Sequence, residues 1–238
     1  MELPVRWVVG RALHFVDVSN PRWATFDCYG TLIDWMSGIR DSLSELWPER
    51  DAELLLGAYH EIEPEVQRGR SIPYRQVLTE ALDRLARREG LHLEEDDRAA
   101  LADSLPAWPA FPEVPRALSA LRERGWRLAI LSNTDPDMLD ASLELIGVPV
   151  DFRITAAEAG SYKPAHGHWD RFFEETRVDR SHHAHVAASL FHDIAPCREL
   201  GLTAVWINRL GERSELPRAA ELPDLADLPD TLDRLVPG

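Results

Sequence analysis

The sequence has little of what would mark a disulfide-linked, membrane-spanning or secreted protein. Its 238 residues include two cysteines, Cys28 and Cys197, which are too few for a disulfide framework, so we expect a reduced, cytoplasmic setting. No apolar run is long enough to cross a bilayer. Residues 1–22 carry charges where a secretory signal needs a continuous apolar stretch, and we expect no such signal.

Positive charge is also scarce. Lysine and arginine number 26 against 41 aspartates and glutamates, which gives a formal net charge of −15 and an isoelectric point of about 5.0. A negative field of this size opposes binding to nucleic acid or to an anionic membrane surface, so we expect neither partner. A small anionic substrate would have to be attracted by a local cluster of cationic or N–H groups.

The second half of the chain alternates between helical and extended patterns. Such strand–helix units predict an α/β fold with a Rossmann-like, doubly wound parallel sheet that is covered on both faces. The expected strands cover residues 126–131, 151–154, 185–188 and 203–207. The expected helices cover residues 115–124, 136–146, 164–176 and 194–200.

A helical region separates the first strand from this alternating half. Residues 74–90 show apolar side chains at helical spacing, and Gly90 is a natural helix stop. We therefore expect an inserted helical cap. The predicted division is an N-terminal extension at 1–22, a core at 23–36 and 106–238, and the cap at 37–105. Residues 5–18 are apolar enough for a strand or hairpin but equally suit a loose extension, and residues 214–238 predict a loop and a short final helix.

The most informative motif is Asp27-Cys28-Tyr29-Gly30-Thr31, which follows a short apolar run at residues 23–26. The run predicts a buried strand that ends in a carboxylate on a tight turn. Open α/β sheets place their active sites at the carboxyl ends of their strands. Asp27 is therefore the first candidate for a catalytic residue.

Two further motifs follow in order along the chain. Ser132 and Asn133 end the next strand, ahead of a helix that begins near Pro136, and such a pair can cradle an anion. Taken alone, they could equally cap the helix. Lys163 comes just before Pro164, which suits a first helical turn.

The fourth motif lies between residues 185 and 201, where Asp193 is a second acid beyond the pair Ala187-Ala188. Taken in order, the four motifs resemble the haloacid dehalogenase superfamily over roughly residues 23–210. Superfamily phosphatases read Asp-x-Asp-Gly-Thr in the first motif, whereas this chain, with Tyr29, resembles the 2-haloacid dehalogenase (type II) branch. The resemblance also places Ala187-Ala188 where the metallophosphatases carry Gly-Asp.

These two differences point in one direction. Tyr29 replaces the phosphatase general acid, and Ala188 replaces a Mg²⁺ ligand with a side chain that has no oxygen. We therefore expect a hydrolase that needs neither metal nor cofactor. The resemblance implies Asp27, Lys163 and Asp193 as the catalytic residues. It also implies a substrate site, for which we name Tyr29, Thr31, Ser132, Asn133, Trp169 and His192.

The expected reaction is nucleophilic displacement at carbon. Asp27 would attack C2 of a 2-halocarboxylate and expel halide, and Asp193 would direct water onto the resulting ester. Two alternatives stay open: a phosphatase with an atypical Mg²⁺ site and a non-catalytic binding protein on the same fold. A homodimer is also possible, because dimers are common among enzymes of this kind.

Several positions depart from the family pattern. The 2-haloacid dehalogenases carry a cap arginine that helps to bind the halide, but residues 56–61 contain none, which leaves Arg68, Arg70 and Arg75 as candidates. Trp169 stands where those enzymes have tyrosine. Beside the fourth motif lie three histidines, which we expect in an exposed loop that enters a strand: His182, His183 and His185.

Overall fold

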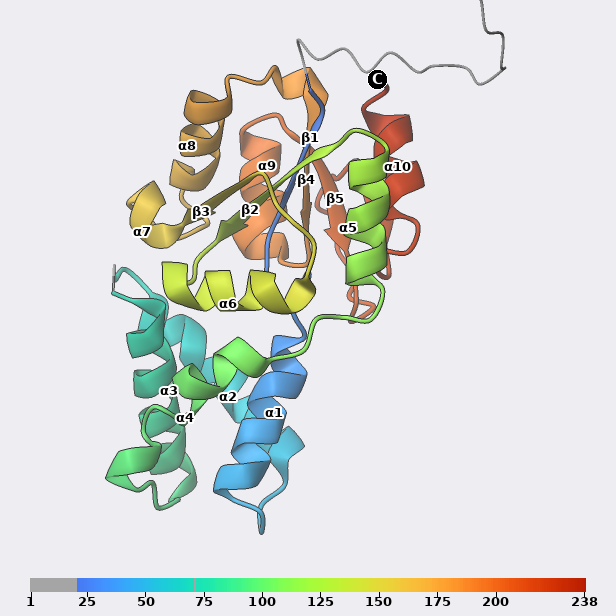
Figure 1. Ribbon diagram of the computed structural model, residues 1–238. Helices are drawn as coiled ribbons and strands as arrows, with labels where there is room; N and C mark the ends of the chain where they lie inside the picture. Colours follow the sequence, from blue (N-terminus) through green and yellow to red (C-terminus); the bar gives the residue numbers. More distant parts are fainter. Residues whose placement is uncertain (1–20, 71) are drawn as a thin grey trace, which may run out of the picture.

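The computed structural model describes residues 21–70 and 72–238, so the strand or hairpin considered for residues 5–18 lies outside the described part. Within that part the chain builds a six-stranded parallel sheet in the order β3-β2-β1-β4-β5-β6 (Figure 1). The strands are β1 (Trp23–Phe26), β2 (Arg127–Ser132), β3 (Phe152–Thr155), β4 (His183–Ala187), β5 (Thr203–Ile207) and β6 (Ala220–Leu222).

Helices cover both faces of this sheet, because every crossover between parallel strands must pass over one face. On one face lie α5 (Val114–Glu123), α6 (Pro136–Ile146) and α10 (Leu228–Leu235), and on the other α8 (Gly167–Thr176) and α9 (Ala195–Glu199). Short α7 (Ala156–Ala159) and η3 (Arg180–His182) complete the connections. The predicted doubly wound α/β fold is confirmed. No helix of the described residues could span a bilayer.

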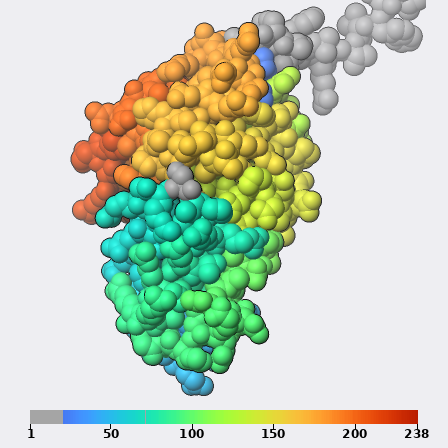
Figure 2. Space-filling view, turned by 90° about the vertical axis from the view of Figure 1, so that its left-hand side faces the viewer, coloured from blue at the N-terminus to red at the C-terminus, as the bar shows by residue number. Residues whose placement is uncertain are grey.

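The helices between β1 and α5 gather beyond the carboxyl ends of the strands (Figure 1). They are α1 (Trp35–Leu46), α2 (Ala52–Gln67), α3 (Tyr74–Glu89) and α4 (Ala100–Ser104), with the short turns η1 (Glu95–Asp97) and η2 (Leu105–Ala107). In Figure 2 this group, cyan to green, lies below the yellow and orange core segments. We assign these helices as the cap. Their apolar side chains form one continuous core with the sheet face that α5 and α10 cover.

Local signals in the sequence position these helices. The Asp34 carboxylate accepts a hydrogen bond from the backbone N–H of Ser37 and so caps α1. At the other end of the cap, α3 stops at Gly90, whose φ of 65° lies in the left-handed region that glycine adopts without strain. The predicted helix over residues 74–90 is therefore confirmed.

The C-terminal region differs from its prediction. Residues 214–238 contain the expected final helix, α10, but also β6, which pairs with β5 at the edge of the sheet. β6 has three residues, none of them buried, so it lacks the apolar alternation that reveals a strand in sequence. The helix expected at 194–200 is confirmed as α9, and a π-helical turn that we did not predict, η4 (Leu190–Ile194), leads into it.

Candidate active site

The site lies at the carboxyl edge of the three central strands. β1 lies between β2 and β4, so the residues that follow these strands converge. Asp27 follows β1, Ser132 ends β2, and Asp193 lies on η4 just beyond β4. This is the position at which open α/β sheets form their sites.

The Asp27 carboxylate is held by both of its oxygens. Oδ1 accepts a hydrogen bond from Lys163 Nζ at 2.8 Å, and Oδ2 accepts one from the Thr31 hydroxyl at 3.0 Å. The Thr31 oxygen in turn accepts the backbone N–H of Ala188 at 2.9 Å. Gly30 makes the turn between them at a φ of 89°. Asp27 is 9% exposed, so a fixed carboxylate still reaches the cavity described below.

Lys163 lies between the two acids. Its Nζ donates to Asp27 Oδ1 at 2.8 Å, to Asp193 Oδ1 at 2.7 Å and to the Leu131 carbonyl at 2.8 Å, which uses all three ammonium protons. Burial disfavours the charged amine, but the charges of Asp193 and Asp27 outweigh it and hold the lysine pKa above its usual range. Lys163 is also the single lysine in the sequence.

Asn133 fixes the backbone that carries this lysine. Its Oδ1 accepts the Lys163 N–H at 2.7 Å, and its Nδ2 donates to the Lys163 carbonyl at 3.1 Å. The neighbouring Ser132 carbonyl accepts a hydrogen bond from His168 Nε2 at 3.0 Å. Burial lowers the His168 pKa to about 4, so this ring is neutral at pH 7. The end of β2 is thus tied to the loop before α8.

Asp193 receives two hydrogen bonds on one oxygen. Oδ1 accepts from Lys163 Nζ and from His185 Nε2, the latter at 3.0 Å, while the buried Oδ2 has no protein partner among the described residues. Burial opposes ionisation, but the charge of Lys163 and the hydrogen bond from His185 outweigh it and hold the Asp193 pKa below its usual range. The ionised carboxylate thus keeps one buried oxygen that can accept a further hydrogen bond.

The structure corrects the expected exposure of the two strand histidines. We expected an exposed loop that enters a strand at His185, yet β4 already begins at His183 and both histidines are fully buried in it. Thr25 of β1 joins them, because its hydroxyl lies 2.8 Å from His183 Nε2 and 2.8 Å from His185 Nδ1. β4 is a central strand of a parallel sheet, so both of its faces are buried.

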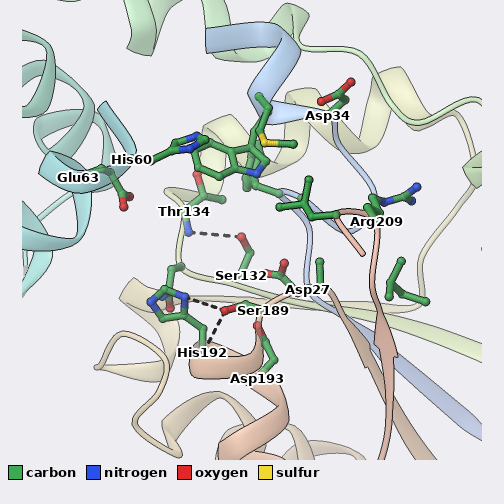
Figure 3. Close-up of a pocket in the computed structure, with 18 of the residues that line it drawn as sticks. Asp27, Asp34, His60, Glu63, Ser132, Thr134, Ser189, His192, Asp193 and Arg209 are labelled. Carbon is green, nitrogen blue, oxygen red and sulfur yellow. Dashed lines mark hydrogen bonds between the residues drawn. The ribbon is translucent and has the colours of Figure 1, made fainter. Parts of the chain in front are cut away.

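A cavity of about 560 Å³ opens between this edge of the sheet and the cap (Figure 3). The core contributes the predicted site residues Asp27, Tyr29, Ser132, Asn133, Lys163, His192 and Asp193. The cap contributes side chains that we did not predict, chiefly Trp35, Arg40, His60, Glu63, Gln67 and Tyr74. Their signal in sequence is weak, because each lies in an ordinary amphipathic helix.

Comparison with known proteins agrees with this geometry. A family profile described as haloacid dehalogenase-like hydrolase matches residues 21–201. The chain belongs to this family. It is 31% identical to an (S)-2-haloacid dehalogenase of Pseudomonas sp. (strain YL), over 78% of this chain and 82% of that protein. It is 29% identical to haloacetate dehalogenase H-2 of Moraxella sp. (strain B), over 78% and 85%.

The fold agrees as well. The crystal structure of the L-2-haloacid dehalogenase RSc1362 superposes with a TM-score of 0.81 at 26% identity, covering 90% of this chain and 99% of that one. The expectation of a haloacid dehalogenase-like hydrolase, built on the four motifs, is therefore confirmed.

Two of the substrate residues expected for this haloacid dehalogenase-like hydrolase do not line the cavity. Trp169 is fully buried in the core beneath the sheet, with its ring centroid 5.4 Å from that of His185. Trp169 follows the motif lysine Lys163 by six residues and lies on the face of α8 that packs against the sheet. Thr31 is also buried, and its hydroxyl holds Asp27. We reassign both as residues that support the site from behind.

The arginines proposed for the cap also lie elsewhere. Arg70 pairs with Glu80, Arg75 pairs with Asp103 and Asp137, and neither they nor Arg68 line the cavity. The arginines that do are Arg40 of α1 and Arg209 after β5. Arg40 pairs with Glu53, and Arg209 pairs with Glu113 at 2.8 Å. Each guanidinium group thus has a carboxylate partner, while the Nε atoms of both arginines have no hydrogen-bond partner among the described residues.

The residues present do not fit the Mg²⁺ ion that phosphatases of this superfamily use. Mg²⁺ needs a near-octahedral set of oxygens, but the Lys163 ammonium already bridges the Asp27 and Asp193 carboxylates, and Ala188 offers no side-chain oxygen. Among the described residues, no cluster of three histidine, cysteine or acidic side chains is arranged to hold a metal. The positive charge beside Asp27 comes from the chain itself.

Proposed function

We propose that this protein hydrolyses a 2-halocarboxylate through an ester formed on Asp27. One observation carries the proposal: a single buried ammonium holds two carboxylates, Asp27 exposed to the cavity and Asp193 with one oxygen unpaired. A nucleophile and a separate base are what two successive displacements require. The dehalogenase names of the relatives support the same reaction class.

In the first step a carboxylate oxygen of Asp27 attacks C2 of the substrate. The new C–O bond forms as the carbon–halogen bond breaks, and the halide leaves with the bonding electrons and needs no proton. Lys163 and Thr31 fix the carboxylate for this attack. Ser132, which lines the cavity at the end of β2, would hold the substrate carboxylate. Attack opposite the halide inverts C2.

In the second step water attacks the ester carbon, Cγ of Asp27. Asp193 Oδ2 accepts the water proton as the oxygen bonds to Cγ. The bond between Cγ and the oxygen that Asp27 had given to C2 then breaks, and that oxygen takes the proton from Asp193 and leaves as the hydroxyl of a 2-hydroxy acid. Asp27 loses its remaining proton and returns to the carboxylate. The net products are the hydroxy acid, a halide and one proton.

The direct test is halide release in the presence of EDTA, measured by ion chromatography. Chloroacetate, bromoacetate, fluoroacetate and both enantiomers of 2-chloropropionate serve as substrates. We expect halide from at least one of them, and none from Asp27→Asn. With enzyme in excess in H₂¹⁸O, the label should enter the peptide that carries Asp27, because water attacks Cγ.

The contrary outcome is equally clear. If no halide is released, and Mg²⁺ instead supports phosphate release from a phosphomonoester, the phosphatase alternative replaces this proposal. Full halide release by Asp27→Asn would likewise overturn the ester mechanism.

A further inference from the structure

The cavity is larger than a two- or three-carbon haloacid requires. Its volume is about 560 Å³, within the roughly 300–1,000 Å³ of pockets that enclose drug-sized ligands. One water molecule has a share of only about 30 Å³ in the liquid, and a haloacetate is a few times larger. A substrate seated at Asp27 therefore leaves much of the space toward the cap unfilled.

Glu63 stands on the cap wall of this space. It lies on α2, and Figure 3 shows its carboxyl group directed into the cavity. Gln67, one turn further along, donates its Nε2 to Glu63 Oε1 and also lines the cavity. Tyr74 also donates a hydrogen bond to the Glu63 carboxylate, so a ligand cation would share these carboxylate oxygens with Gln67 and Tyr74.

No cation compensates Glu63 among the described residues. Its titratable neighbours are Tyr59 and His60 on its own helix, Tyr74 of α3 and Tyr162 of the loop before Lys163. Burial raises the pKa of Glu63 to about 7, and this effect outweighs the lowering of the pKa by hydrogen bonds from Gln67 and Tyr74. A ligand cation beside this carboxyl group would favour its ionised form.

Aromatic rings line the same part of the cavity. The rings of Trp35 and His60 lie tilted against each other with centroids 4.8 Å apart, and the ring centroids of Tyr29 and Tyr74 are 6.4 Å apart. The faces of tryptophan and tyrosine attract organic cations, most strongly where water is excluded. His60 Nε2 has no hydrogen-bond partner among the described residues, and burial lowers the His60 pKa, so this ring adds no positive charge.

The charges of the cavity agree with a cationic ligand group. Its three cationic side chains are each paired with protein acids: Lys163 with Asp27 and Asp193, Arg40 with Glu53, and Arg209 with Glu113. The chain as a whole carries a net charge of −15, a field that concentrates cations near its surface.

We propose that the cap wall binds a positively charged amine of the substrate, with Glu63 as its counter-ion and Trp35 and Tyr74 as its aromatic walls. The substrate is then a 2-halocarboxylate with an ammonium group at its far end. This inference rests on the proposed function for the reacting end, whereas the amine subsite stands on its own geometry.

The test uses two ligands that differ only in charge. Binding of the zwitterion 6-(trimethylammonio)hexanoate and of 7,7-dimethyloctanoate, a carboxylate whose tail is uncharged, to the full chain is measured by isothermal titration calorimetry. Neither carries a leaving group, so binding is read apart from chemistry. We expect the ligand with the ammonium tail to bind at least about tenfold more tightly, the range of a partly desolvated ion pair with cation–π contacts. Glu63→Gln should remove this preference.

A matched variant and a matched reaction complete the design. Glu65→Gln makes the same change on the exposed side of α2 and should keep the preference. The 2-bromo forms of the two ligands should show the same ratio in kcat/KM. If Glu63→Gln unfolds, Trp35→Leu is used in its place. Trp35→Leu should weaken binding of the ligand with the ammonium tail more than binding of the ligand with the uncharged tail.

The outcomes separate the two proposals. Equal binding of both ligands, or a preference that survives in Glu63→Gln, overturns the amine subsite even where bromoacetate is hydrolysed. A preference that depends on Glu63, without bromide release from any 2-bromo acid, supports the subsite and removes the dehalogenase function.

Discussion

His185 Nε2 lies 3.0 Å from Asp193 Oδ1, and this hydrogen bond is the end of a buried chain through the sheet. Since the Asp193 carboxylate can only accept, His185 donates from Nε2, and its Nδ1 must accept from the Thr25 hydroxyl. That hydroxyl then accepts from His183 Nε2. The chain fixes the His185 tautomer, and it holds Asp193 so that Oδ2 stays unpaired.

Replacing His185 should slow ester hydrolysis more than ester formation. In His185→Phe, Asp193 loses one of the two donors that orient it, and an error of about 1 Å in a catalytic group can cost about 100-fold in rate. We expect ester hydrolysis to fall about tenfold or more. Rapid-quench intact-mass measurements with bromoacetate would show the ester accumulating on Asp27.

His185→Gln is the matched control, because a glutamine amide can still donate to Asp193. It should restore most of the hydrolysis rate. Equal rates of ester formation and breakdown in His185→Phe and in the unmodified protein would contradict a positioning role.

Removal of the lysine charge should destabilise the fold. Lys163→Met leaves Asp27 and Asp193 facing each other without a cation, and loss of one partner of a buried ion pair costs about 3–5 kcal/mol. The midpoint of thermal unfolding should fall by roughly 6–20 °C for a domain of this length. Differential scanning calorimetry measures it, and an unchanged midpoint at pH 7 would refute the pairing.

The pH dependence of this variant has a definite sign. In the unmodified protein the lowered Asp193 pKa contributes stability at neutral pH that is lost as the pH falls through the acidic range. In Lys163→Met that contribution is absent, and one of the two carboxylates takes up a proton readily. The difference in unfolding free energy between the two proteins should therefore narrow between pH 7 and pH 5.

The single lysine gives a direct probe of burial. Lys163 is 2% exposed, and its raised pKa keeps the amine protonated and unreactive. An amine-directed acylating reagent should therefore leave Lys163 unmodified in the folded protein and label it fully in denaturant. Peptide mass spectrometry reads the result, and rapid labelling of Lys163 under native conditions would refute its placement between the acids.

Glu63 should make the fold less stable as the pH rises. Its pKa of about 7 lies above the reference of 4.5, so the folded protein binds this proton more tightly than the unfolded chain. Stability from this group is complete below about pH 4.5 and is lost as the pH rises to about 7. Glu63→Gln removes that loss and should be about 1–3 kcal/mol more stable at pH 8.

Urea unfolding of both proteins at pH 4.5 and pH 8 measures this difference. We expect near-equal stability at pH 4.5 and a gain for Glu63→Gln at pH 8. If the difference in unfolding free energy between the two proteins were the same at both pH values, the Glu63 carboxyl group would not have the raised pKa of a buried acid that lacks a cation.

The sequence by itself determined the frame of this protein. Glycines and prolines end or start elements at fixed places, as Gly90 does for α3 and Pro136 for α6. Runs of apolar residues mark the buried strands, and an acid or a lysine at a strand end marks the catalytic edge. Taken in order, the four motifs resemble the haloacid dehalogenase superfamily, and that resemblance grouped Asp27, Lys163 and Asp193, although Lys163 is 136 and 30 residues away from its two acids.

Only the tertiary structure decided how the other side chains are used. Sequence spacing does not tell which face of a helix meets the cavity, so Trp169 turned out to lie in the core, whereas Glu63 faces the pocket. Nor does it tell that the polar side chain of His185, although it lies in a predicted strand, is buried, because its burial depends on Thr25 and Asp193, partners from other segments. A buried polar group is stable only where distant residues satisfy it, and the fold alone brings them together.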